Sequence, residues 1–143
     1  MGASSSGNIR ETSVLKEACQ KLRRAGTMND ELKTTMEDTF KKRFQQGLAL
    51  VEQGKVRRFR FEPSGRNVWV VDGRKGEYQV VPESMFCTCD DYYFRVMGHK
   101  RQLCYHLIAQ YLAEALGRYG KFSSVDAEYA GFTAKWKPFA ASG

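Results

Sequence analysis

The sequence predicts an α+β fold with N-terminal helices, a small antiparallel β-meander and a Cys/His knuckle that leads into a C-terminal helix. Apolar residues first recur at helical spacing and then alternate with polar residues in three short runs. A cluster of cysteines and one histidine follows, directly before a further apolar helical pattern. With 143 residues, 42% of them hydrophobic, the chain can bury one modest core.

Two helical segments are predicted before the strands. Ser13 is placed to cap the first and Gly26 to end it, so residues 1–11 are expected to form a disordered tail. Asn29 and Asp30 are placed to cap the second segment, and Gly47 leaves open whether that segment is one helix or two. The expected buried stripes are Leu15, Ala18, Cys19 and Leu22 in the first segment and Leu32, Met36, Phe40, Phe44, Leu48 and Val51 in the second.

Residues 55–61, 67–71 and 76–81 are rich in valine and aromatic residues, and turn-forming residues separate them. This pattern predicts a three-stranded antiparallel meander. In its first strand, Phe59 and Phe61 point to one face while Arg58 and Arg60 point to the other. The aromatic face is expected to pack on the helices, and the arginines are expected to face solvent.

Four potential metal ligands lie close together in the sequence: Cys87, Cys89, Cys104 and His106. Cys87 and Cys89 can bind one ion from an extended segment, because residues two apart point to the same side. Cys104 and His106 would lie about 200° apart around a regular helix, so the pair is expected where a turn becomes a helix. Three thiolates and an imidazole form a ligand set typical of Zn²⁺, and four protein ligands leave no open position for catalysis.

Two alternatives at this cluster stay open. His99 lies in the insert between the cysteine pairs and is a rival fourth ligand, although the fixed spacing from Cys104 favours His106. Asp90 and Asp91 could suggest acid–base chemistry, but such a pair more often caps a short helix. The remaining cysteine, Cys19, is interpreted as a small buried apolar residue.

The helix after His106 is expected to end at Gly120. These boundaries predict a single domain over residues 12–120, with a zinc-finger core at about 77–116 and a C-terminal tail at 121–143. Phe132, Trp136 and Phe139 in that tail could form a docking peptide or pack back on the domain, and the second interpretation is preferred.

The net charge of +7 suits an acidic partner such as DNA, and most of the basic excess precedes the cysteine cluster. A solvated basic face is an equally good interpretation of these residues. The candidate contacts to DNA or a partner are Arg57, Arg58 and Arg60, followed by Lys41, Lys42 and Arg43.

The pattern resembles the SWIM zinc finger, in which Cys-x-Cys, a variable insert and Cys-x-His precede a helix. Residues 86–92 and 104–109 resemble its core, and residues 43–56 resemble its usual lead-in. The resemblance covers residues 40–116. Tyr105 stands where family members commonly have lysine, but this position is not a ligand.

The short chain is most similar to the small stand-alone SWIM proteins of archaea and eukaryotes, which work with recombinase paralogues in homologous recombination. The resemblance implies a non-enzymatic zinc adaptor in DNA repair that binds a recombinase-type ATPase paralogue and could also touch DNA. The alternative is a direct DNA-binding protein in transcription or mobile-element control. The sequence has no P-loop and no His-Glu-x-x-His motif. It also has no long apolar run, so we expect no membrane association and an intracellular protein, cytoplasmic in a prokaryote and nuclear in a eukaryote.

Overall fold

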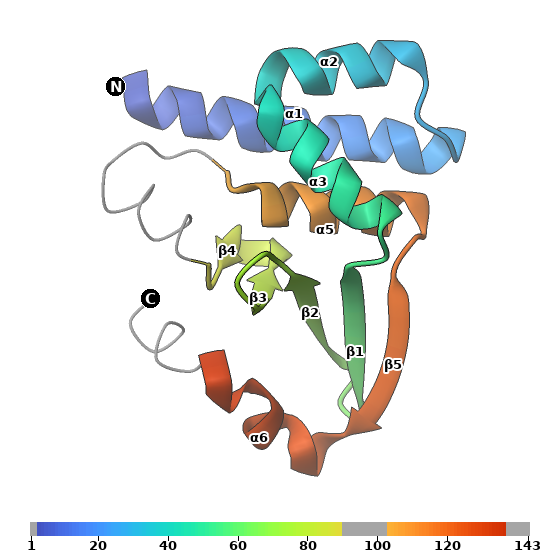
Figure 1. Ribbon diagram of the computed structural model, residues 1–143, viewed down its shortest axis with the longest axis vertical. Helices are drawn as coiled ribbons and strands as arrows, with labels where there is room; N and C mark the ends of the chain where they lie inside the picture. The colour runs from blue at the N-terminus through green and yellow to red at the C-terminus, as the bar shows by residue number, and fades with distance from the viewer. Residues whose placement is uncertain (1–2, 90–102, 137–143) are drawn as a thin grey trace.

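The computed structural model describes residues 3–89 and 103–136 (Figure 1). Three helices precede the sheet, and a fourth long helix follows the metal-ligand cluster. The α-helices are α1 (Ala3–Ala25), α2 (Asp30–Phe40), α3 (Lys42–Glu52), α5 (Tyr105–Leu116) and α6 (Tyr129–Thr133). The strands are β1 (Val56–Glu62), β2 (Arg66–Asp72), β3 (Glu77–Val81), β4 (Phe86–Cys87) and β5 (Gly120–Val125). The α+β prediction is therefore confirmed.

The five strands form one mixed sheet in the order β4-β3-β2-β1-β5. The meander β1-β2-β3 is antiparallel as predicted, with Val56 opposite Val71 and Val71 opposite Tyr78. Strand β5 adds to the outer side of β1 in parallel, with Phe59 beside Phe122. The prediction that the chain from residue 121 onward is a tail outside the domain is wrong in this respect, because these residues complete the sheet.

The sheet separates two hydrophobic cores, and successive β2 residues alternate between them. Trp69 and Val71 belong to the larger core with the long helices, whereas Val68 and Val70 belong to a smaller one. Helices α1, α2, α3 and α5 lie together beside one end of the sheet, and α6 lies near the other end, by β1 and β5 (Figure 1). Because one core covers each face of β2 at this point, residues 68–71 are buried without interruption.

The smaller core corrects the expected packing of β1. Phe59 and Phe61 do face the same way, but they pack against the C-terminal segment and not against the long helices. The Phe132 ring lies 4.6 Å from the Phe59 ring and 5.5 Å from the Phe61 ring. Trp136 is buried there, and its indole N–H donates to the carbonyl of Glu77 at 3.0 Å. The described part of the C-terminal segment therefore packs back on the domain, whereas Phe139 lies outside the described residues.

Helix α1 begins at Ala3, so residues 3–11 extend the first helix where a disordered tail was predicted. The second helical segment is indeed divided, but at Lys41 (φ 55°) and not at Gly47. Helix α5 ends earlier than predicted, because Gly117 (φ 69°) supplies the left-handed C-cap that was expected at Gly120. No helix in residues 3–89 and 103–136 combines the length and apolar character needed to cross a bilayer.

Gly47 lies inside α3 because α5 passes too close for a side chain. A Cβ at this position would lie 3.1 Å from the Tyr105 carbonyl oxygen and 3.2 Å from the Ala109 nitrogen. Both neighbours are backbone atoms of α5 and cannot rotate away. The glycine weakens helix propensity but allows the two helices to pack closely, so the local cost is offset by tertiary contact.

We expect Gly47→Ala to lower the free energy of unfolding by about 1–3 kcal/mol, because the added methyl group overpacks the α3–α5 contact. Gly131→Ala in α6 is the matched control, since a Cβ there would meet nothing within 4 Å. Urea denaturation of both variants measures the difference. An unchanged or raised midpoint for Gly47→Ala would show that α3 and α5 can separate without cost.

Candidate metal centre

The sheet positions the first two ligands. Cys87 lies in β4 opposite Val80 of β3, which fixes its side chain on the face toward α5. The next residue, Thr88, is buried and binds β3 twice: its N–H donates to the Gln79 carbonyl at 3.1 Å, and its hydroxyl accepts from the Gln79 N–H at 3.0 Å. Because Thr88 is held in this way, Cys87 and Cys89 project together into the same space.

The other two ligands lie where the chain enters α5. Cys104 is the N-cap residue in an extended conformation (φ −78°, ψ 159°), and His106 is in the first helical turn. This is the turn-to-helix geometry that the two-residue spacing required. The position also provides the partial positive charge of a helix N-terminus, which favours thiolate over thiol.

The four side chains converge on one point. The candidate ligand atoms of Cys87, Cys89, Cys104 and His106 all lie within 4.8 Å of one another. Each of the four residues is at most 3% exposed. Three sulfur atoms and one imidazole at this separation can surround a single metal ion and exclude water from it.

The electrostatics of the cluster suit a cation. Burial raises the pKa of Cys87 and of Cys104, whereas hydrogen bonds from those two residues lower the pKa of Cys89. Burial therefore disfavours the thiolate form of Cys87 and of Cys104, whereas the hydrogen bonds favour it for Cys89. His106 is buried, and neither ring nitrogen has a hydrogen-bond partner among the described residues. A bound dication would stabilise the other thiolates and would satisfy a ring nitrogen, so these residues fit a metal ion.

Comparison with known proteins agrees with this geometry. The chain is 27% identical over 108 residues to "Zinc finger SWIM domain-containing protein 7 homolog" from Dictyostelium discoideum. The match covers 74% of this chain and 69% of that relative. This match and the ligand cluster support the resemblance to the SWIM-type zinc finger proteins. No protein-family model and no solved structure matches the chain.

Around the four potential metal ligands, aromatic rings and one glycine shape the pocket of His106. The Tyr105 and Tyr78 rings lie 4.3 and 4.9 Å from the imidazole, centroid to centroid. A Cβ on Gly73 would approach the His106 Nε2 to 2.8 Å and the Tyr78 ring to 2.6 Å. The β2–β3 turn therefore carries a glycine where a larger residue would displace the histidine. In the sequence, Gly73 is one of the turn-forming residues between the second and third predicted strands, and no local pattern links it to His106.

An ion pair between α1 and α3 also helps to position the metal ligands. The Arg43 guanidinium donates to both Glu11 carboxylate oxygens, at 3.1 and 2.7 Å, and each side chain is 13% exposed. Both residues also bind the backbone of Leu103. Its N–H donates to Glu11 at 3.0 Å, and its carbonyl accepts from Arg43 at 2.6 Å. Because Leu103 directly precedes Cys104, this pair holds the chain where it re-enters the metal centre.

Sequence reasoning did not find the role of this pair. Arg43 was a candidate contact to DNA or a partner, and Glu11 fell in the predicted disordered tail. No local pattern joins residues separated by 32 and 92 positions, so only the fold brings them together.

The other predicted contact residues lie in different surroundings. Arg57 donates to Asp72 and Glu77, both at 2.6 Å, and its pKa is raised by these carboxylates against the effect of burial. Arg60 is exposed and pairs with Glu62 at 2.8 Å. Arg58 is half-buried against the Tyr119 ring, while Lys41 and Lys42 are exposed at the α2–α3 junction. Three of the six residues lie on β1, and the other three lie at the start of α3.

Two histidines compete for the fourth ligand position, and mutation separates them. His106 lies within the cluster, whereas His99 lies outside the described residues. His106→Ala is expected to release the metal or weaken its binding by at least tenfold, because a buried donor is lost. His99→Ala is expected to keep about one metal ion per chain. Inductively coupled plasma mass spectrometry of both purified variants measures the outcome, and the reverse pattern would replace His106 in the ligand set.

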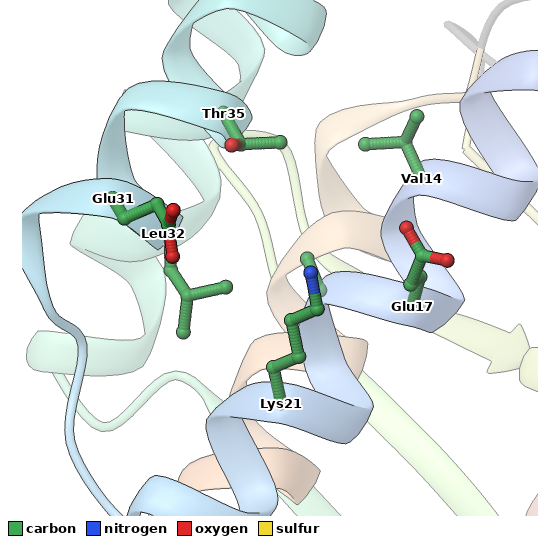
Figure 2. Close-up of a pocket in the computed structure, with 7 residues that line it drawn as sticks. Val14, Glu17, Lys21, Glu31, Leu32 and Thr35 are labelled. Atoms are coloured by element: carbon green, nitrogen blue, oxygen red, sulfur yellow. The ribbon is translucent and has the colours of Figure 1, made fainter.

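Away from the metal ligands, a hollow of about 150 Å³ lies between α1 and α2 (Figure 2). Its charged lining consists of Glu17 and Lys21 from α1 and Glu31 from α2, all exposed. Leu32 forms part of its floor. Opposite charges on two solvated helices are typical of a helix–helix seam, so we assign no chemistry to this hollow.

Proposed function

We propose that the chain binds one structural Zn²⁺ and acts as a non-enzymatic adaptor in DNA recombination and repair. Its partner is a recombinase-type ATPase paralogue, as the resemblance to small stand-alone SWIM proteins implies. In this proposal the ion supplies folding free energy and not Lewis-acid chemistry. The adaptor works inside the cell, in the cytoplasm of a prokaryote or the nucleus of a eukaryote.

The observation that carries this proposal is the closure of the metal centre. Three sulfur donors and one nitrogen donor lie within 4.8 Å of one another, which is the number and kind of ligands that a structural zinc site uses, and all four ligand residues are almost fully buried. Catalytic zinc sites keep one position for water or substrate, whereas structural sites are filled by protein. In this proposal the closed, buried site stabilises the fold, and the adaptor acts through its surface.

The engagement of the arginines favours a protein partner over DNA as the primary ligand. Contact with phosphates needs free cations, and each neutralised phosphate contributes to the salt dependence of binding. Arg43 and Arg57 are already paired with carboxylates of the same chain. Using either one for DNA would require breaking a partly buried ion pair. Fewer of the predicted basic residues are therefore available to contact phosphates than the sequence suggested.

Affinity purification from an extract of the source organism, followed by mass spectrometry, tests the proposal. The wild-type protein should recover a recombinase-type ATPase paralogue, and Cys104→Ser should not, because the fold that presents the binding surface depends on the metal. Cys19→Ser is the control for loss of a buried thiol outside the metal centre. Recovery of transcription or mobile-element proteins in place of the ATPase would favour the alternative function.

Direct DNA binding makes a separate prediction on β1. Replacing both Arg58 and Arg60 with alanine should lower the magnitude of the log–log salt slope by about 1 for each lost phosphate contact. The variant should fold, with a cost of about 1 kcal/mol from the contact between Arg58 and Tyr119. Arg23→Ala/Arg24→Ala removes the same charge from the exposed end of α1 and serves as the control. Fluorescence anisotropy with duplex and single-stranded DNA measures both, and equal slopes would exclude this strand as a DNA contact.

A further inference from the structure

Strand β5 forms an open edge of the sheet. It comes last in the strand order, and in the described part of the chain it pairs with β1 alone. Figure 1 shows β5 at the margin of the sheet, opposite the short β4. The backbone N–H and carbonyl groups on the outer side of such a strand can pair with an added strand.

Edge strands usually carry charged residues or proline, which prevent another strand from pairing with them. Strand β5 has few such residues. Its sequence, Gly-Lys-Phe-Ser-Ser-Val, has one charge, no proline and no acidic residue. Phe122 is 46% exposed and Val125 is 53% exposed. They are the large hydrophobic residues most open to solvent among those described, and both are in this strand. Phe122 stacks on Phe59 at 5.0 Å, which extends the smaller core outward to the edge.

On the face opposite Phe122, the same edge carries positive charge. Lys121 lies beside Arg58 in the parallel register, and both cations lie 5.4 Å from the Tyr119 ring. Within the described ranges, neither Arg58 nor Lys121 is in an ion pair, in contrast to Arg57 and Arg60. The Arg58 Nε is also buried without a hydrogen-bond partner there. Two adjacent cations without carboxylates favour an acidic ligand.

We propose that the β5 edge binds an extended acidic segment of a protein partner, which adds to the sheet as a sixth strand. The inference deepens the proposed adaptor function and rests on it. Side chains alternate across a strand, so the segment would place carboxylates toward Lys121 and Arg58 and apolar side chains toward Phe122. Backbone pairing gives affinity, and this alternation gives selectivity.

Two other occupants fit the edge less well. A second copy of the chain, paired through β5, would bring two Lys121 and two Arg58 side chains to one edge, while β5 itself supplies no carboxylate. DNA would gain only these two free cations and would leave Phe122 and the strand hydrogen bonds unused, whereas DNA-binding proteins commonly neutralise about 6–10 phosphates.

The probe is a fluorescein-labelled octapeptide of alternating glutamate and valine, and its counterpart has lysine in place of glutamate. Anisotropy titrations of the metal-bound full chain should give at least tenfold tighter binding of the acidic peptide. Lys121→Glu should abolish that preference, and Phe122→Ser should weaken binding at least fivefold. Lys75→Glu, which makes the same charge change at an exposed loop position, should bind as the wild type does. Equal binding of both peptides, or equal binding by all variants, would overturn the proposal.

Amide hydrogen exchange distinguishes strand addition from simple charge attraction. Saturation with the acidic peptide should slow exchange within residues 120–125, whereas amides of α2 should be unaffected. Unchanged exchange in β5, tighter binding of a single-stranded DNA octamer, or dimerisation through β5 in light scattering would each contradict the acidic-strand assignment. These measurements use no recombination protein, so recovery of the ATPase partner with a negative peptide result would reject the docking site and leave the adaptor function intact.

Discussion

Replacing Cys87 or Cys104 with serine is expected to remove the bound zinc and most of the cooperative fold. Both sulfurs are buried in the larger core, between β4 and the start of α5. Structural zinc contributes roughly 10–16 kcal/mol in isolated zinc-finger peptides, which is similar in size to the typical net stability of about 5–15 kcal/mol for a whole domain. Metal analysis and circular dichroism melting of the purified variants measure the two losses.

Cys19→Ser provides the contrast, since it changes a buried cysteine that does not face the cluster. Burial raises the pKa of Cys19 to about 12, so this residue remains an uncharged thiol and suits a place among apolar side chains. The variant should keep one zinc per chain and lose only about 1–3 kcal/mol for a buried hydroxyl. Full zinc content and unchanged melting in Cys87→Ser and Cys104→Ser would refute the structural role of the metal.

Removing the α1–α3 ion pair is expected to loosen the metal centre without touching a ligand. Arg43→Ala leaves the Glu11 carboxylate partly buried and the Leu103 carbonyl without its donor. We expect a loss of about 2–3 kcal/mol, less than the roughly 3–5 kcal/mol for breaking a fully buried pair, since each side chain keeps some exposure. Zinc transfer to a coloured chelator should be severalfold faster, because Cys104 follows the released residue directly.

Two further variants test whether the lost ion pair causes the faster zinc transfer of Arg43→Ala. Glu11→Gln keeps an oxygen that can accept from the Leu103 N–H but removes the charge, so its effect should be intermediate. Lys42→Ala removes one exposed positive charge next to Arg43 and should release zinc at the wild-type rate. If Arg43→Ala destabilised the fold while zinc transfer kept its wild-type rate, the pair would support the helices alone.

The sequence by itself determined the elements whose signals are local. Helical spacing gave the buried stripes from Leu15 to Leu22 and from Leu32 to Val51, and alternation with turn residues gave the β1-β2-β3 meander. The four potential ligands could also be named in advance. Two ligands spaced two residues apart can bind one metal ion from an extended segment or from the start of a helix. The structure has both arrangements: Cys89 follows two residues after Cys87 at the end of β4, and Cys104 is the N-cap of α5.

The tertiary structure alone decided what depends on residues distant in sequence. Strand β5 has weak strand character, and its parallel pairing joins residues about 63 positions apart, so no local pattern indicates it. The same holds for Glu11, which binds the residue before Cys104 only because α1 passes beside Leu103. It also holds for Gly47, which is needed because α5 approaches so closely. Propensity and periodicity report the conformational preferences of neighbouring residues, whereas these contacts form only when burial of the core brings distant segments together.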